Sequence, residues 1–199
     1  DNQFDLAIVD PPYGIKENAH RINKPKKAAA KTKLYNSSIW DCSKPTEKYF
    51  QQLFRVSKNQ IIWGGNYFID NLTSTRCFIV WDKQSEYSQQ VADCELAWTS
   101  FKKSVKKFTF RWCGMLQGDM KNKEIRIHPT QKPVALYEWL LINYAKKGDT
   151  ILDTHLGSGS IAIACHNLGF ELTGYEIDKE YFEAANKRIE QHKAQKRLF

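Results

Sequence analysis

Short apolar runs alternate with stretches of helical periodicity along this chain. The first run, Phe4 to Val9, is closed by two prolines, which predicts a buried strand that leads into a loop. Similar runs predict further strands at 61–63, 77–81, 95–98, 150–153 and 170–175. Apolar positions at helical spacing predict helices over 46–57, from Pro133 to about Gly148, and over 161–168.

Two stretches lack any periodicity. Residues 14–45 are rich in Lys, Ala, Asn and Ser, which predicts a long, mobile, basic loop at about 15–45. Residues 113–127 are polar, charged and irregular. A chain of 199 residues, 42% of them hydrophobic, can bury one core and is short for two, so we expect a single domain over 1–199.

Composition excludes several classes of protein. No run approaches the ~20 apolar residues that cross a bilayer, and the first residues lack the features of a secretory signal, so we expect a cytoplasmic protein without membrane contact. The five cysteines form an odd, widely spaced set without a Cys-x-x-Cys pair. This spacing argues against a disulfide framework and against a zinc site, so we expect reduced thiols and no metal.

The formal net charge of +8 is concentrated in two windows that contain no acid. Each window contributes five positive charges, so together they account for all of the excess. Such patches are expected where one face of a protein meets a polyanion, and we expect them to bind DNA. Aromatic residues interleave the second window, where they would either stack on bases or pack an edge strand. The basic residues are Lys24, Lys26, Lys27, Lys31 and Lys33 in the first window, and Lys102, Lys103, Lys106, Lys107 and Arg111 in the second.

The segment Asp10-Pro11-Pro12-Tyr13-Gly14 matches the needs of methyl transfer to the exocyclic amine of a base. The amine is a poor nucleophile, because its lone pair is delocalised into the ring. Asp10 offers a carboxylate acceptor, and two prolines without N–H leave only carbonyl oxygens beside it. Two acceptors would hold the two amine hydrogens, and the Tyr13 ring would stack on a base turned out of the duplex. The alternative is a simple turn.

A second motif, His128-Pro-Thr-Gln-Lys-Pro133, precedes a predicted helix. Pro133 suits the first helical position, and the free N–H groups of a helix start favour an anionic group. Thr130, Gln131 and Lys132 would be additional donors. By itself, the motif would be interpreted first as an ordinary helix cap.

A third motif combines the strand Thr150 to Asp153, a glycine-rich turn from Thr154 to Ser160, and a second strand that ends at Glu176. Glycines let the backbone approach a ligand, and a carboxylate after the next strand can accept hydrogen bonds from ribose hydroxyls. The pattern also satisfies the dinucleotide fingerprint. Only 23 residues follow Glu176, which is too few for the rest of a nucleotide-binding half sheet, so we expect an adenosyl ligand without pyrophosphate.

In this order, the three motifs and Tyr175-Glu-Ile-Asp178 resemble the beta group of amino DNA methyltransferases, bacterial and phage enzymes in which the catalytic motif precedes the cofactor motif. The resemblance spans nearly the whole chain. It implies an α/β fold of the Rossmann-like methyltransferase type, with a mixed, mostly parallel sheet flanked by helices and a circularly permuted motif order. It also implies S-adenosylmethionine as cofactor, double-stranded DNA as partner, and N6 of adenine as the usual acceptor.

The resemblance assigns roles to individual residues. Asp10 and the carbonyl of Pro11 would hold the amine, with Pro12 and Tyr13 completing the catalytic motif. Thr130, Gln131 and Lys132 would meet the methionine end of the cofactor. The remaining cofactor-binding residues would be Asp10, Asp153, His155, Gly157, Ser158, Gly159, Glu176 and Ile177.

Three departures from the family pattern affect these expectations. The usual Asp-Pro-Phe is Asp153-Thr154-His155 here, so the apolar contact of the phenylalanine is in question. A further strand that ends in Gly-Asp commonly precedes the catalytic strand, so an edge strand of the sheet is expected to be missing. The region of about 99–127 is short for target recognition.

Several functions stay open at this point. N4 of cytosine fits the same acceptors as N6 of adenine, and a non-catalytic DNA-binding remnant of the fold would explain the departures. Methylation of RNA or protein is weaker, since protein methylases of similar design tend to carry Asn where this chain has Asp10. Family resemblance is consistent with a homodimer and with a cognate restriction endonuclease.

Overall fold

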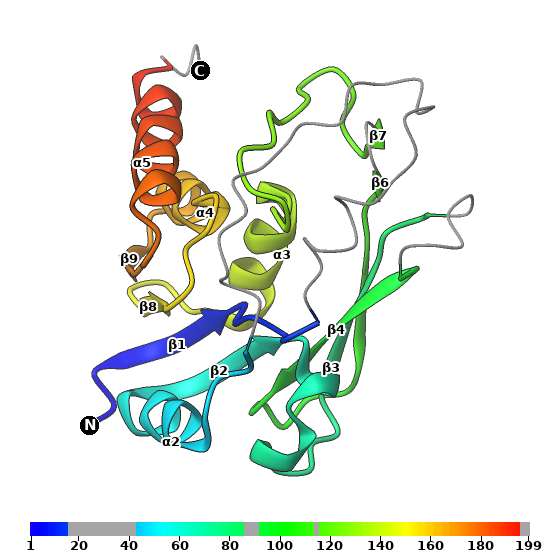
Figure 1. Ribbon diagram of the computed structural model, residues 1–199, viewed down its shortest axis with the longest axis vertical. Helices are drawn as coiled ribbons and strands as arrows, with labels where there is room; N and C mark the ends of the chain where they lie inside the picture. Colours follow the sequence, from blue (N-terminus) through cyan, green and yellow to red (C-terminus); the bar gives the residue numbers. More distant parts are fainter. Residues whose placement is uncertain (16–42, 86–91, 114–115, 196–199) are drawn as a thin grey trace.

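The computed structural model describes residues 1–15, 43–85, 92–113 and 116–195. A seven-stranded sheet forms its centre, in the order β5-β3-β4-β2-β1-β8-β9 (Figure 1). Its strands are β1 (Phe4–Val9), β2 (Ser57–Trp63), β3 (Phe78–Asp82), β4 (Cys94–Thr99), β5 (Lys106–Thr109), β8 (Thr150–Asp153) and β9 (Glu171–Gly174). A separate two-stranded ribbon consists of β6 (Trp112–Cys113) and β7 (Leu116–Gln117).

Strand β4 alone runs against the other strands of the large sheet. It pairs antiparallel with β2 and with β3, whereas β1 pairs parallel with β2 and with β8, β8 with β9, and β3 with β5. The sheet is therefore mixed and mostly parallel, as expected. The carboxyl ends of the parallel strands and the amino end of β4 lie at the same edge.

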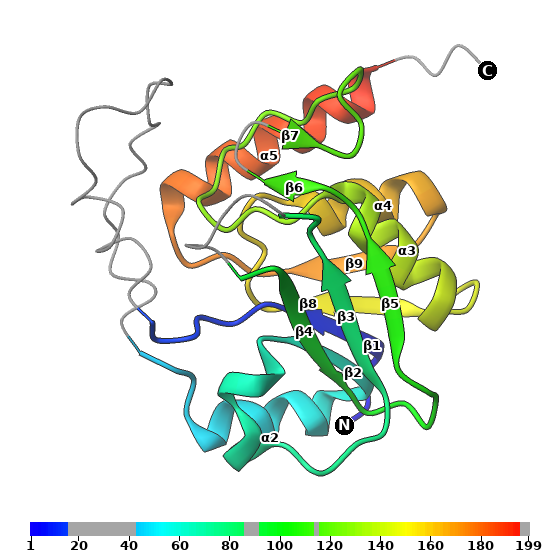
Figure 2. The same ribbon diagram turned by 90° about the vertical axis from the view of Figure 1, so that its right-hand side faces the viewer.

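Helices cover both faces of the sheet (Figures 1 and 2). They are α2 (Glu47–Val56), α3 (Val134–Tyr144), α4 (Ser160–Leu168) and α5 (Lys179–Ala194), with short 3-10 turns η2 (Gly65–Tyr67) and η3 (Ile69–Asn71). Side chains alternate between the faces of a strand, so each strand contributes to two cores. In β1, Leu6 and Ile8 belong to one buried cluster, and Ala7 and Val9 belong to the other.

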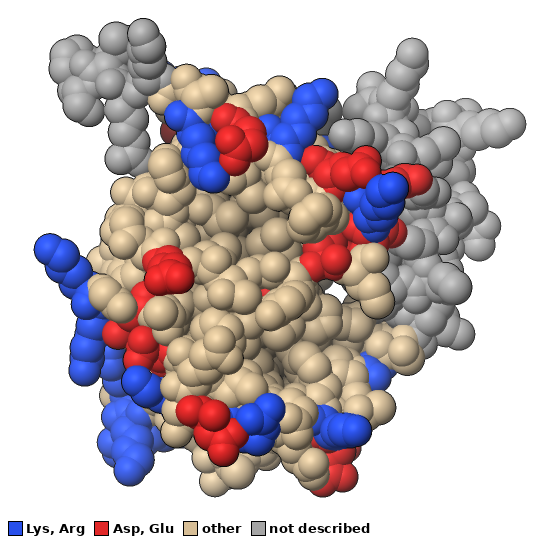
Figure 3. Space-filling view, turned by 90° about the vertical axis from the view of Figure 1, so that its left-hand side faces the viewer, with Lys and Arg blue, Asp and Glu red and all other residues tan. Residues whose placement is uncertain are grey.

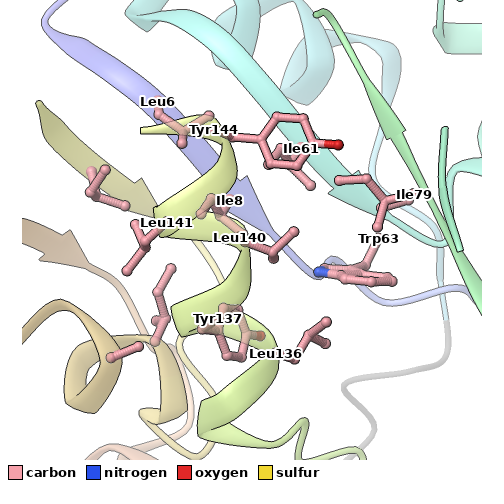
Figure 4. Packing of buried hydrophobic residues seen from close by; sticks show 14 of the residues in the cluster. Leu6, Ile8, Ile61, Trp63, Ile79, Leu136, Tyr137, Leu140, Leu141 and Tyr144 are labelled. Atoms are coloured by element: carbon pink, nitrogen blue, oxygen red, sulfur yellow. The ribbon is translucent and has the colours of Figure 1, made fainter. Parts of the chain in front are cut away.

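The larger core lies between the sheet and α3. Figure 4 shows Ile8, Ile61 and Trp63 of the sheet facing Leu136 and Leu140 of this helix. Both leucines are fully buried. Burial of a leucine side chain stabilises a fold by about 1.5–3 kcal/mol. This packing therefore fixes α3, and with it the His128–Pro133 segment that enters the helix, over the carboxyl edge of the sheet.

Most elements agree with the sequence-based predictions. The strands at 4–9 and 150–153 have the predicted bounds, and β2, β3, β4, β9, α2 and α4 confirm the others with shifts of a few residues. Helix α3 begins at Val134, because Pro133 is its N-cap, and it ends at Tyr144 rather than near Gly148. The sequence did not predict helix α5 or strands β5, β6 and β7. The predicted loop at 15–45 lies almost entirely outside the described residues.

Among the described residues, no helix is long and apolar enough to span a membrane, and no group of three or more His, Cys, Asp or Glu side chains is placed to hold a metal. The described cysteines, Cys77, Cys94, Cys113 and Cys165, are free thiols.

Candidate active site

Three motif carboxylates come together at the carboxyl edge of the sheet. Asp10 follows β1, Asp153 ends β8 and Glu176 follows β9, and these three strands are neighbours. Burial raises the pKa of Asp153, and the charges of Asp10 and Glu176 raise it further. Asp10 and Asp153 are 143 positions apart in the sequence. The sheet topology nevertheless brings the first and third motifs together at the edge where open α/β sheets bind ligands.

Both carboxylate oxygens of Asp10 are engaged by the chain itself. Oδ1 accepts a hydrogen bond from the hydroxyl of Tyr13 at 2.7 Å, and Oδ2 accepts one from the ammonium group of Lys132. Pro11 is buried and Pro12 is half-buried, and neither has an N–H. The carboxylate is therefore held in a fixed orientation before any substrate arrives.

The ring of Tyr13 is closely packed. It stacks on Tyr67, with centroids 4.8 Å apart and planes at 16°, and it contacts Phe68 edge-on at 6.0 Å. Gly64 leaves room for it, because a Cβ there would lie 2.2 Å from the ring, and the φ of +68° at Gly64 also favours glycine. Burial and the charge of Asp10 raise the pKa of Tyr13 well above 10, so the hydroxyl remains a donor.

Lys132 lies in a buried charge cluster that sequence reasoning did not foresee. Its side chain is 3% exposed, and its ammonium group contacts Asp10 and also Oε2 of Glu95, at 3.1 Å. Lys83 binds the other oxygen of Glu95. Burial alone would raise the pKa of Glu95, but Lys132 and Lys83 outweigh it and hold this pKa at about 2. We call Asp10, Lys132, Glu95 and Lys83 the charge cluster.

The glycine-rich turn is bound to Glu176. Gly157 (φ +52°) and Gly159 (φ +71°) both adopt left-handed backbone, and Gly159 is the N-cap of α4. The carboxylate of Glu176 accepts hydrogen bonds from the backbone N–H of Gly157 at 2.8 Å and of Asp178 at 2.9 Å. The next side chain, Ile177, is 97% exposed.

Asp153 and His155 lie at the beginning of this turn. Asp153 is buried and accepts a hydrogen bond from the backbone N–H of His155 at 2.9 Å. Burial raises the pKa of Asp153 to about 7 and lowers that of His155 to about 4. The neutral His155 ring contacts Tyr49 of α2 edge-on at 5.5 Å. An aromatic contact thus exists at the position where the family pattern has phenylalanine.

The start of α3 is occupied by a carboxylate of the chain. Oε1 of Glu124 accepts a hydrogen bond from the backbone N–H of Val134 at 2.9 Å, which is the position where we expected a ligand anion. Gln131 is buried, and its side-chain oxygen accepts the N–H of Ile127 at 2.9 Å. Of the three donors expected here, Thr130 is half-exposed, and its hydroxyl lies 3.1 Å from Nδ1 of His128.

Arg188 of α5 connects this region to the glycine-rich turn. One guanidinium nitrogen donates to the carbonyl of Ser158 at 2.8 Å and to the hydroxyl of Ser160 at 2.9 Å, and the other contacts Glu124 at 2.6 Å. Sequence reasoning missed both Arg188 and Glu124, because nothing in the spacing of two residues 64 positions apart indicates that they pair.

The second basic window lies along β5, at the edge of the sheet opposite to β9. Lys102, Lys103 and Lys106 are exposed at the amino end of β5, whereas Asp10 follows the carboxyl end of β1. Lys103 donates to the carbonyl of Asn143, and Lys107 pairs with Asp82 at 3.3 Å. Arg111 is half-buried beyond the carboxyl end of β5. The first basic window lies outside the described residues.

The aromatic residues of the second window pack into the protein. Phe101, Phe108 and Phe110 lie against the larger core, and Trp112 is part of it. Figure 3 shows another face of the molecule, where basic and acidic side chains lie mainly around the rim of a broad uncharged surface. Of the two readings of these aromatics, packing of an edge strand is the one that the structure bears out.

A mostly parallel sheet between helices, with an acidic residue and a glycine-rich turn at its carboxyl edge, defines the Rossmann-like methyltransferase fold. Solved structures with this fold include the M1.HpyAVI-SAM complex, with a TM-score of 0.56 and 24% identity over 94% of this chain and 89% of that one. PvuII DNA methyltransferase, named as cytosine-N4-specific, has a TM-score of 0.58 and 12% identity, over 96% and 85% of the two chains.

The sequence match is more specific than the fold. The DNA methylase family of the N6/N4 type matches residues 80–187, more than half of the chain, and the chain belongs to this family. The type II methyltransferase M2.DpnII of Streptococcus pneumoniae is 30% identical over 160 residues, which are 79% of this chain and 52% of that protein. The chain thus spans about half the length of this relative. The family match includes Lys132 and the glycine-rich turn and begins after Asp10.

Proposed function

We propose that this protein transfers a methyl group from S-adenosylmethionine to N6 of adenine in double-stranded DNA, with N4 of cytosine as the alternative acceptor. The main support is the position of Asp10 beside the glycine-rich turn, at the ends of the adjacent strands β1 and β8. An acceptor for an amine and a turn suited to an adenosyl ligand thus share one edge. Both exocyclic amines carry two N–H groups, so the acceptors alone do not favour either base.

The turn has the chemical groups that the cofactor requires. Glu176 presents a carboxylate to ribose hydroxyls, the exposed Ile177 offers an apolar side chain to the adenine ring, and Gly157 and Gly159 add no side chains to the turn. Asp153, His155 and Ser158 complete the proposed pocket, with Thr130 toward the methionine end. When bound, S-adenosylmethionine supplies a methyl carbon attached to a positively charged sulfur.

The chain's own residues prepare the amine. Asp10 and the carbonyl of Pro11 accept its two hydrogens, which draws electron density back onto nitrogen. The nitrogen would then bond to the methyl carbon while the carbon–sulfur bond breaks and leaves its electron pair on sulfur, and the methylated nitrogen would lose one proton to Asp10. The target base leaves the duplex to reach this position, and Tyr13, fixed by Tyr67 and Gly64, forms one wall beside it.

DNA is the proposed substrate because the acceptor chemistry, the basic windows and the family agree on it. The name of M2.DpnII as a type II methyltransferase also motivates a cognate restriction endonuclease, and the family motivates a homodimer. The endonuclease and the homodimer are proposed on family membership alone.

The test is nucleoside analysis. Unmethylated DNA is incubated with the protein and S-adenosylmethionine, digested and examined by mass spectrometry. We expect N6-methyladenine in the wild type and a loss of about 10²–10³-fold in rate for Asp10→Ala. Asp70→Ala, a change of an exposed carboxylate in η3, is the matched control and keeps the wild-type rate.

Other outcomes have defined meanings. N4-methylcytosine alone would move the assignment to cytosine. If neither product forms, and calorimetry with sinefungin shows no binding while DNA still binds in a salt-sensitive way, the protein is a DNA-binding remnant of the fold.

A further inference from the structure

Within the charge cluster, the ammonium group of Lys132 competes with an acceptor amine for the carboxylate of Asp10. Oδ2 of Asp10 is bound to Lys132, and an ammonium group on this oxygen withdraws charge from the carboxylate, so Asp10 becomes a stronger acceptor for the amine when Lys132 gives up this oxygen. Lys132 is 3% exposed, and the rings of Trp63 and Tyr13 lie 5.4 and 6.0 Å from its nitrogen. A buried cation without an anion is strongly unfavourable. Release of Asp10 therefore requires a second anion within reach.

Glu95 is placed to be that anion. Its Oε2 lies 3.1 Å from the nitrogen of Lys132 while Lys132 still contacts Asp10, so a small movement completes the exchange. Glu95 lies at the amino end of β4, the reversed strand, which brings it to the edge where the other strands end. Lys83, after β3, binds Oε1 and neutralises part of the same charge.

We propose that Glu95 is a positioning residue that takes over the ammonium group of Lys132 when the acceptor amine binds Asp10. This inference rests on the proposed methyl transfer. Lys132 covers Asp10 in the free protein, and Glu95 and Lys83 set how readily it leaves. A ligand that binds only the released form binds more weakly in proportion to the population of that form.

Two variants are expected to change activity in opposite directions. Glu95→Gln removes the second anion, holds Lys132 on Asp10 and lowers kcat/KM for DNA about tenfold, with the affinity for sinefungin unchanged. Lys83→Met leaves the whole charge of Glu95 to Lys132, so kcat/KM for DNA rises about threefold. A structural defect would lower activity in both variants.

Controls separate charge from folding. Glu95→Asp keeps the carboxylate and recovers most of the lost activity. Glu183→Gln is the matched control, since Glu183 pairs with Lys179 on the surface of α5 at 3.9 Å. It is expected to behave as the wild type. A crystal structure of the wild type with sinefungin and a methylatable duplex should show Lys132 bound to Glu95 and separated from Asp10.

The outcomes distinguish this inference from the proposed function. If the wild type methylates DNA but Glu95→Gln and Glu183→Gln have equal kcat/KM values, the role of Glu95 is wrong and the function stands. A fall in both Glu95→Gln and Lys83→Met, or weaker sinefungin binding in Glu95→Gln, also overturns the role of Glu95. If the wild type methylates no DNA, the proposed function itself fails.

Discussion

The side chain of Asp153 is almost completely buried, and its surroundings change its acidity. Burial raises its pKa from 3.8 to about 7, and the charges of Asp10 and Glu176 act in the same direction. The folded protein therefore keeps a proton on Asp153 between about pH 4 and pH 7, where the unfolded chain has lost it. The folded state binds more protons in this window, so this group contributes stability that is lost as the pH rises through it.

Asp153→Asn should remove this loss, because an amide stays neutral. The free energy of unfolding of the variant, relative to that of the wild type, should increase by on the order of 2–4 kcal/mol between pH 4 and pH 8. Urea unfolding at pH 4, 6 and 8 measures the difference. Burial lowers the pKa of His128 and His155 to about 4, but both histidines are present in both proteins, so their contribution cancels. An equal difference at all three pH values would show that Asp153 does not titrate in this range.

Residue types were predictable at this scale, but their partners were not. The sequence placed Asp10, Asp153 and Glu176 at strand ends, and the structure brings them to one edge. Lys132 was expected to face the cofactor because it precedes a helix. In the structure its ammonium group contacts Asp10, 122 positions away, and Glu95. Such pairings depend on which strands are neighbours, and no local spacing encodes them.

At the scale of elements, apolar runs predicted strands well because each run coincides with a strand of the large sheet or lies within one, to within a residue at either end. Helix α5 was missed because its buried side is narrow and consists of Tyr181, Ala185 and Ile189 within a polar segment. Two signals were available. Those three residues recur every four positions, and Asp178 is a good N-cap residue, whose side chain accepts hydrogen bonds from Glu180 and Tyr181.

Helix α5 contributes to the cofactor side through Arg188. Arg188→Met removes the hydrogen bonds to Ser158 and Ser160 and the ion pair with Glu124, so the glycine-rich turn loses its support. We expect the dissociation constant for sinefungin to rise about tenfold, measured by calorimetry. Lys187→Met, an exposed neighbour on the same helix, should have no effect.

A second variant tests whether Arg188 and Glu124 act as a pair. Glu124→Gln should weaken sinefungin binding as well. The double variant should lose less binding free energy than the two single variants together, because each single change already breaks the same Arg188–Glu124 interaction. Fully additive losses would mean that Arg188 and Glu124 act separately.

At the scale of the whole molecule, the residues of the second basic window fall into two groups according to their position along β5. Lys102, Lys103 and Lys106 lie at the amino end of β5, away from the edge with Asp10, whereas Lys107 lies further along the strand and Arg111 beyond its carboxyl end. The proposal that this window binds DNA is therefore strongest for Lys107 and Arg111. Sequence reasoning could not make this distinction, because it shows that charges cluster but not which end of a strand they occupy.

Salt dependence tests this division. Changing Lys102, Lys103 and Lys106 together to Gln should leave the slope of log K against log salt unchanged to within about 1, whereas each lost phosphate contact changes it by about 0.9. The matched triple change of Lys24, Lys26 and Lys27 should reduce the slope by about 2–3. Equal reductions in the two triple variants would show that DNA also contacts the amino end of β5.

The position of β1 between β2 and β8 has a consequence for biosynthesis. Asp5 and its hydrogen-bonding partner Thr150 are 145 residues apart, so a ribosome that adds about 5–20 residues per second needs roughly 7–29 s after β1 to deliver β8. During that time one side of an apolar strand has no neighbour. Nascent chains with such an open edge are prone to aggregate. Synthesis of β8 is therefore the step that closes the open edge of β1 and lowers the tendency of the nascent chain to aggregate.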